Sequence, residues 1–103
     1  MDRVNRVQNL VAQIQTQAAL QRIFNPNLNL FARNLKRANS KKHIVAYNLL
    51  RMIINDEGLL INETDCRVIS QSANMIWNSF TPAEKNIFKI YAAQIRTMVG
   101  VRN

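Results

Sequence analysis

Five basic side chains between residues 33 and 42 carry the clearest potential for chemistry in this 103-residue chain. No acidic residue lies between Asp2 and Asp56, so no acidic side chain close in sequence neutralises these basic residues. Guanidinium and ammonium groups bind phosphate through charge-assisted hydrogen bonds. A net charge of +8 for the whole chain favours a polyanionic partner such as nucleic acid, although a charge run is also typical of a solvated linker. The basic residues are Arg33, Lys36, Arg37, Lys41 and Lys42.

Catalytic and metal-binding sets of residues are not indicated. His43 and Cys66 are each the only residue of their type, which predicts neither a zinc site nor a disulfide. The acids gather mainly between residues 56 and 65, without a Ser/His/acid set or a phosphate-cradling glycine loop. We therefore predict a protein that is not an enzyme and that uses no metal and no cofactor. No apolar run approaches the ~18 residues of a membrane span, so no membrane partner is expected.

The composition predicts an all-α protein. Two glycines, two prolines and many Leu, Ile, Ala, Asn and Gln residues favour helices over strands, and the length fits one domain. Apolar periodicity, turn residues and charge divide the chain into four predicted parts. These are an N-terminal amphipathic helix (1–24), a basic linker or arm (25–43), a three-helix domain (44–99) and a short tail (100–103).

The first predicted helix carries an apolar stripe at a spacing of three to four residues. We expect the stripe to pack on its own domain, on a protein partner or on a second copy of the chain. A mitochondrial import signal is the alternative, because Arg3, Arg6 and Arg22 accompany few acids, although the early Asp2 is atypical. The stripe consists of Val4, Val7, Val11, Ile14 and Ala18.

A sharp corner between two helices is predicted at Thr81. Thr81 can cap the following helix, Pro82 fits its first position, and Glu84 completes a capping box. Trp77 and Phe80 precede the cap at helical spacing, which is typical of an aromatic anchor for a small core.

The residues around this corner resemble the signature of the HMG box. The signature runs Trp, two residues, an apolar residue, Thr or Ser, Pro, any residue, Glu, Lys, and an aromatic one turn later. The resemblance covers about residues 41–99, and it is closest to the mating-type-like boxes of fungi. The earlier pairs Ile69-Ser70 and Ala46-Tyr47 are also similar to the family. The corner residues that match are Trp77, Phe80, Thr81, Pro82, Glu84, Lys85 and Phe88.

The resemblance implies an L-shaped three-helix domain whose concave face binds the DNA minor groove, inserts an apolar wedge and bends the duplex. The chain departs from the family at Val45, where a base-contacting asparagine is frequent, and at Asn48, which occupies the wedge position. Leu49 or Met52 is the alternative wedge. Besides the basic arm, the residues that we expect to contact DNA are Asn48, Leu49, Arg51, Met52, Arg67, Ser70 and Lys85.

The sequence therefore predicts a nuclear transcription regulator that binds double-stranded DNA. The first alternative is a helical protein–protein interaction module on a degenerate HMG scaffold. The second is a mitochondrial DNA-packaging protein whose first 23 residues direct import.

Overall fold

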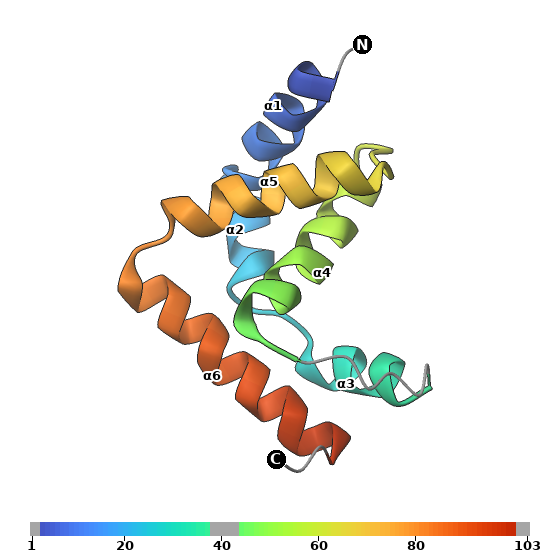
Figure 1. The fold of residues 1–103 in the computed structure, drawn as a ribbon, viewed down its shortest axis with the longest axis vertical. Helices are drawn as coiled ribbons and strands as arrows, with labels where there is room; N and C mark the ends of the chain where they lie inside the picture. Colours follow the sequence, from blue (N-terminus) through green and yellow to red (C-terminus); the bar gives the residue numbers. More distant parts are fainter. Residues whose placement is uncertain (1–2, 38–43, 101–103) are drawn as a thin grey trace.

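A computed structural model of the chain describes residues 3–37 and 44–100, and all regular structure in these residues is α-helical (Figure 1). The prediction of an all-α protein is confirmed for this part of the chain. No helix in it is long and apolar enough to cross a membrane. The helices are α1 (Arg3–Ile14), α2 (Gln17–Ile23), α3 (Leu28–Arg37), α4 (Ala46–Leu59), α5 (Cys66–Ser79) and α6 (Pro82–Val99).

Helices α4, α5 and α6 occupy the region predicted as a three-helix domain. Helix α5 crosses α4 and packs on it, and α6 departs from the end of α5 at a corner (Figure 1). At this corner the Thr81 hydroxyl accepts a hydrogen bond from the Glu84 amide (3.2 Å), while the Glu84 carboxylate accepts one from the Thr81 amide (2.8 Å). Pro82 takes the first helical position, so the predicted capping box is confirmed.

Aromatic rings fill the corner. Phe88 is fully buried and stacks on Phe80 with ring centroids 5.4 Å apart. The Phe80 ring also contacts the rings of Trp77 and Phe24, with centroid distances of 6.1 Å and 5.5 Å. Because Phe24 follows α2, this cluster joins the N-terminal third of the chain to the corner. Tyr91 strengthens the junction by donating a hydrogen bond to the Phe24 carbonyl (2.8 Å).

Residues 3–23 form two helices where the sequence predicts one. The break comes at Thr16, whose hydroxyl caps α2 by accepting a hydrogen bond from the Ala19 amide (3.2 Å). Leu10 and Ile14 of α1 and Ile23 of α2 are fully buried, because α1 packs on α5 and α4 while α2 packs on α4. Of the predicted apolar stripe, Val7 and Ile14 are buried and Val11 is half-buried, whereas Val4 and Ala18 are exposed, so only the middle of the stripe packs on its own domain.

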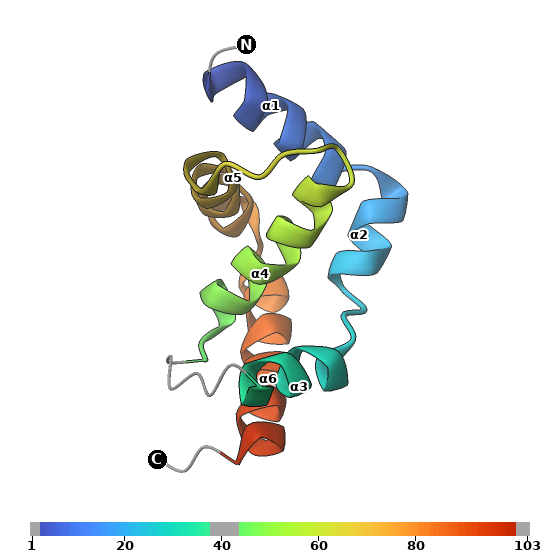
Figure 2. The same cartoon turned by 90° about the vertical axis from the view of Figure 1, so that its right-hand side faces the viewer.

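A helix also occupies most of the stretch that the sequence predicts as a basic linker. Helix α3 follows Pro26 and lies across α6 (Figure 2). Leu28, Phe31 and Leu35 recur on one face, which supplies the apolar surface that holds the helix against the core. The positive charge of Arg33 obscures this pattern in the sequence.

Two arginines tie the N-terminal helices to buried carboxylates. Arg6 of α1 pairs with Glu63, and Arg22 of α2 pairs with Glu57 through two hydrogen bonds of 2.7 and 2.9 Å. Both glutamates are buried. Arg6 and Arg22, which suggest an import signal in the sequence, are therefore structural partners of α4 and of the loop that follows it.

Gly58 lies within α4 and does not end it, because the helix continues to Leu59. A side chain at this position would place its Cβ 2.8 Å from the Glu63 carbonyl and 2.9 Å from the Ile69 side chain. Gly58 is therefore needed for the close approach of the loop to the helix. The left-handed backbone of this loop occurs instead at Asn62, with φ of 59°.

Candidate nucleic-acid interface

A row of exposed polar side chains follows the seam between α4 and α5. At one end, the Tyr47 hydroxyl donates a 2.6 Å hydrogen bond to the Asn74 side-chain oxygen. Arg51 lies one turn after Tyr47 on α4, and Ser70 lies one turn before Asn74 on α5. We call this row the α4–α5 face. It consists of Asn48, Arg51, Asn55, Arg67, Ser70 and Asn74, all of them exposed except the half-buried Ser70.

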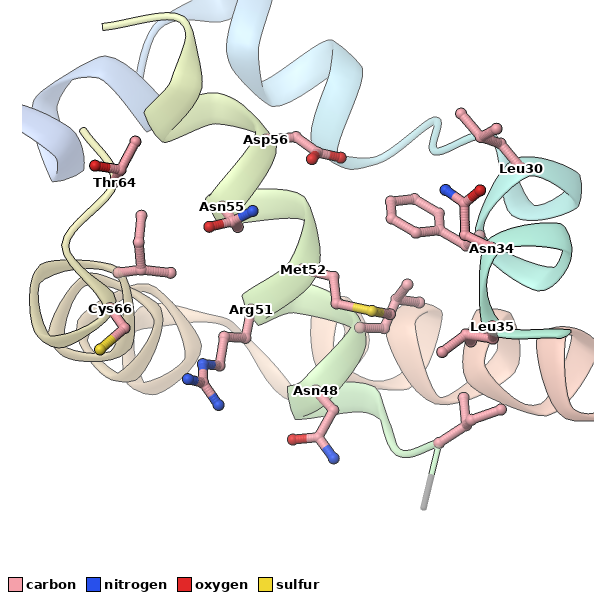
Figure 3. Close-up of a pocket in the computed structure, with 14 residues that line it drawn as sticks. Leu30, Asn34, Leu35, Asn48, Arg51, Met52, Asn55, Asp56, Thr64 and Cys66 are labelled. Atoms are coloured by element: carbon pink, nitrogen blue, oxygen red, sulfur yellow. The ribbon is translucent and has the colours of Figure 1, made fainter. Parts of the chain in front are cut away.

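A groove of about 670 Å³ adjoins this face between α3, α4 and the start of α5. Arg51 extends from α4 toward α5, whereas Met52 extends toward Leu35 of α3 (Figure 3). The lining is mixed, with apolar side chains such as Phe31 and Ile69 beside the amides of Asn48 and Asn55. The groove thus places apolar side chains beside groups that can hydrogen bond with a nucleic acid.

The candidate wedge residues differ in burial. Leu49 is fully buried, so inserting it between base pairs would require it to leave the core. Asn48 is exposed but polar. Met52 is half-buried and lines the groove, and its flexible thioether is the apolar group on α4 best placed for contact with bases.

The predicted basic residues are only partly gathered at this site. Arg51 and Arg67 lie on the α4–α5 face, and Arg33 is exposed on α3. The Lys85 ammonium lies 5.5 Å from the centre of the Trp77 ring, so its contact in the structure is a cation–π interaction at the corner. The side chains of Lys36 and Arg37, and the whole of Lys41 and Lys42, lie outside the described residues.

One carboxyl group opposes phosphate binding at the groove. Asp56 lines the wall formed by α4. Burial raises the pKa of Asp56 above its ordinary value, and the neighbouring charge of Glu57 raises it further. The negative charge of Asp56 therefore lies on the same surface that the arginines make positive.

Asn55 and Asn74 belong to the α4–α5 face but do not stand out in the sequence. Asn74 follows Ser70 by four residues and Arg67 by seven, so helical spacing places all three on one face of α5. That spacing was the available signal, although polar residues at such positions also occur on ordinary solvated helices. Comparisons with protein-family models, curated proteins and solved structures give no match for this chain.

Proposed function

We propose that this chain binds double-stranded DNA through the minor groove, bends it, and acts as a nuclear transcription regulator built on an HMG-box scaffold. The observation that carries the proposal is the aromatic corner at Trp77 and Phe80, with its capping box, joined to a row of exposed amides and arginines. The corner supports the family resemblance, and the α4–α5 face supplies groups of the kind that contact a duplex.

Each part of this surface has a defined task in the proposal. Arg51 and Arg67 bind backbone phosphates, and the arm ending near residue 43 adds further positive charge. Met52 presses against the base pairs from the groove. Unstacking one base step costs a few kcal/mol, which extra phosphate contacts on the bent duplex offset.

A protein–protein interaction module is the second candidate, and one observation favours it. Leu59, Leu60 and Ile61 are 54%, 62% and 38% exposed. Leu59 ends α4, and the turn that follows is held by amide hydrogen bonds from residues 60, 61 and 62 to carbonyls three residues earlier, of 3.0 to 3.2 Å. Adjacent exposed aliphatic side chains on an ordered loop are typical of a contact surface.

The mitochondrial alternative requires removal of about the first 23 residues. Their removal would uncover the core around Leu10, Ile14 and Ile23 and would leave Glu57 and Glu63 without their arginines. Because this removal would destabilise the fold, we infer that the protein keeps its N-terminal helices. A protein that keeps them fits the nuclear proposal better than the mitochondrial one.

The test is fluorescence anisotropy of a labelled duplex and of a four-way junction, each titrated at two or more salt concentrations. We expect tight, salt-sensitive binding with a preference for the junction. Arg51→Ala and Arg67→Ala should each weaken binding and reduce the salt slope by about 1. The matched control is Arg3→Ala, since α1 contributes no residue to the α4–α5 face. If the duplex does not bind at low salt despite the charge of +8, the DNA proposal is wrong.

A further inference from the structure

We propose that α6 carries a self-association surface, through which two copies of this chain form a dimer. The inference goes beyond the proposed function and does not depend on it, because α6 contributes no residue to the α4–α5 face. It rests on the pattern of exposure and charge along this helix.

Helix α6 has a covered side and an open side. It lies at the edge of the fold and packs on α3 and α4 (Figure 1). On its open side, exposed residues recur at a spacing of three to four, so helical geometry places them within about 80° of one another. Three of them are large and apolar, since Ile87, Ile90 and Met98 are 36%, 50% and 39% exposed. We call these residues the α6 outer stripe, which consists of Ala83, Ile87, Ile90, Gln94 and Met98.

No charged residue belongs to the α6 outer stripe, although the chain carries a net charge of +8. The four charged residues of α6 lie about 90° or more around the helix from the middle of the stripe. Three of these have partners elsewhere. Glu84 completes the capping box, and Lys85 takes part in the cation–π contact at the corner. Arg96 donates a hydrogen bond to the Ile44 carbonyl, and the fourth residue, Lys89, is exposed.

The lack of charge decides which partner fits the stripe. A polyanion such as DNA finds no cation on it, and a strongly acidic or basic protein finds no opposite charge. Two copies of this chain repel one another through their net charge, and they approach most easily where each presents uncharged groups. The occupant that we assign to the stripe is therefore a second copy of the chain.

The stripe also matches itself about a two-fold axis. In a two-fold dimer, a residue i contacts residue j of the partner while j contacts i. An axis that passes between Ile87 and Ile90 brings Ile87 of each copy against Ile90 of the other, at the centre of the contact. The small Ala83 then faces Gln94 and leaves room for its longer side chain. The two helices run antiparallel, which places the positive end of each helix dipole near the negative end of the other.

The size of the stripe predicts a weak dimer. A helix of 18 residues is about 27 Å long, and one pair of such helices buries less than the ~1,200–2,000 Å² of a stable complex. We therefore expect a reversible dimer that forms at high protein concentration.

Sedimentation equilibrium of the full chain without DNA, from about 5 to 500 µM, measures this dimer directly. We expect the wild type to change from monomer to dimer across the range. Ile90→Glu should weaken association roughly ten-fold or more, because it places an unpaired charge against Ile87 of the other copy. The matched control is Met75→Glu, which makes the same change of charge at a 51% exposed residue of α5. Thermal melting verifies that both variants remain folded.

A mixture of two variants tests the two-fold pairing. Ile87→Lys and Ile90→Glu should each associate poorly alone. Their equimolar mixture should associate more strongly, because the mixed dimer pairs the introduced ammonium with the introduced carboxylate and keeps one contact between Ile87 and Ile90. A variant that had only lost its fold would not recover on mixing.

Three outcomes overturn the inference. A wild type that stays monomeric at about 500 µM removes the dimer. Equal weakening by Met75→Glu and Ile90→Glu shows that the α6 outer stripe is not the contact surface. No recovery in the mixture rules out the pairing of Ile87 with Ile90. Because the assay contains no DNA, a failure of duplex binding in the anisotropy experiment overturns the proposed function alone.

Discussion

Arg6 of α1 and Glu63 of the loop before α5 form a two-point ion pair between residues 57 positions apart in the chain. The Arg6 Nε lies 2.8 Å from Oε1 of Glu63, and its Nη2 lies 2.6 Å from Oε2. Glu63 is only 6% exposed, and a buried carboxylate without a partner is strongly unfavourable. The pair therefore attaches the first helix to the loop between the fourth and the fifth.

This pair makes stability depend on pH in the acid range. The hydrogen bonds from Arg6 hold the pKa of Glu63 below its ordinary 4.5. A lowered pKa in the folded state adds stability above pH 4.5, which is lost as the pH falls through the folded value. We expect Arg6→Ala to lower the Tm at pH 7 by roughly 5 °C and to flatten the pH dependence below 4.5. Thermal melts from pH 3 to 7 measure both effects, with the exposed Arg33→Ala as control. Identical pH profiles for Arg6→Ala and wild type would contradict the prediction.

Helix α1 should contribute to global stability through its buried face. Leu10 is fully buried, so Leu10→Ala should lower the free energy of unfolding by about 2–5 kcal/mol. Val4 lies on the same helix but is 63% exposed, and Val4→Ala should change it by less than about 0.5 kcal/mol. Urea denaturation followed by circular dichroism compares the two. A similar small effect for both variants would mean that α1 does not belong to the core.

The contribution of the capping box to the free energy of unfolding should be measurable with single substitutions at Thr81. Thr81→Ala removes the acceptor for the Glu84 amide and should cost about 1 kcal/mol of unfolding free energy. Thr81→Ser keeps the hydroxyl and should stay close to wild type. Urea denaturation midpoints at constant m-value report the difference. Equal losses for Ala and Ser would assign the effect to the threonine methyl group instead of the hydrogen bond.

Neutralising Asp56 should improve both stability and DNA binding. Its pKa is raised in the fold, so the protonated form is favoured there, and that contribution is lost as the pH rises through the folded value. At pH 7, Asp56→Asn should raise the Tm slightly and tighten duplex binding roughly two-fold, because one negative charge leaves the groove. Asp56→Glu keeps the charge and serves as control. Weaker binding by Asp56→Asn would show that this carboxylate takes part in recognition.

Features set by neighbouring residues could be predicted from the sequence. The corner at Thr81 depends on hydrogen bonds that span three residues, and the end of α6 depends on the left-handed Gly100 alone. The partners of Arg6 and Arg22 could not be predicted in this way, because 57 and 35 residues separate them from their glutamates. Nothing near either arginine in the sequence identifies those carboxylates.

The candidate site was partly predictable for the same reason. Asn48, Arg51 and Met52 were predicted from the resemblance, and the structure places all three on α4 beside the groove. Leu49, which adjoins them in sequence, turns into the core because successive helical residues are separated by about 100°. The hydrogen bond from Tyr47 to Asn74 joins two helices, and nothing near either residue in the sequence indicates it.

The position of α3 against α6 has a consequence for synthesis of the chain. A ribosome releases α1, α2 and α3 first, yet the surfaces that cover them belong to α4, α5 and α6. The apolar faces of α1 and α2 therefore stay uncovered until α4 and α5 have emerged, and that of α3 stays uncovered until α6 has emerged. We expect folding to occur largely after translation, and more slowly than in a bundle of the same size whose neighbouring helices pack in sequence order.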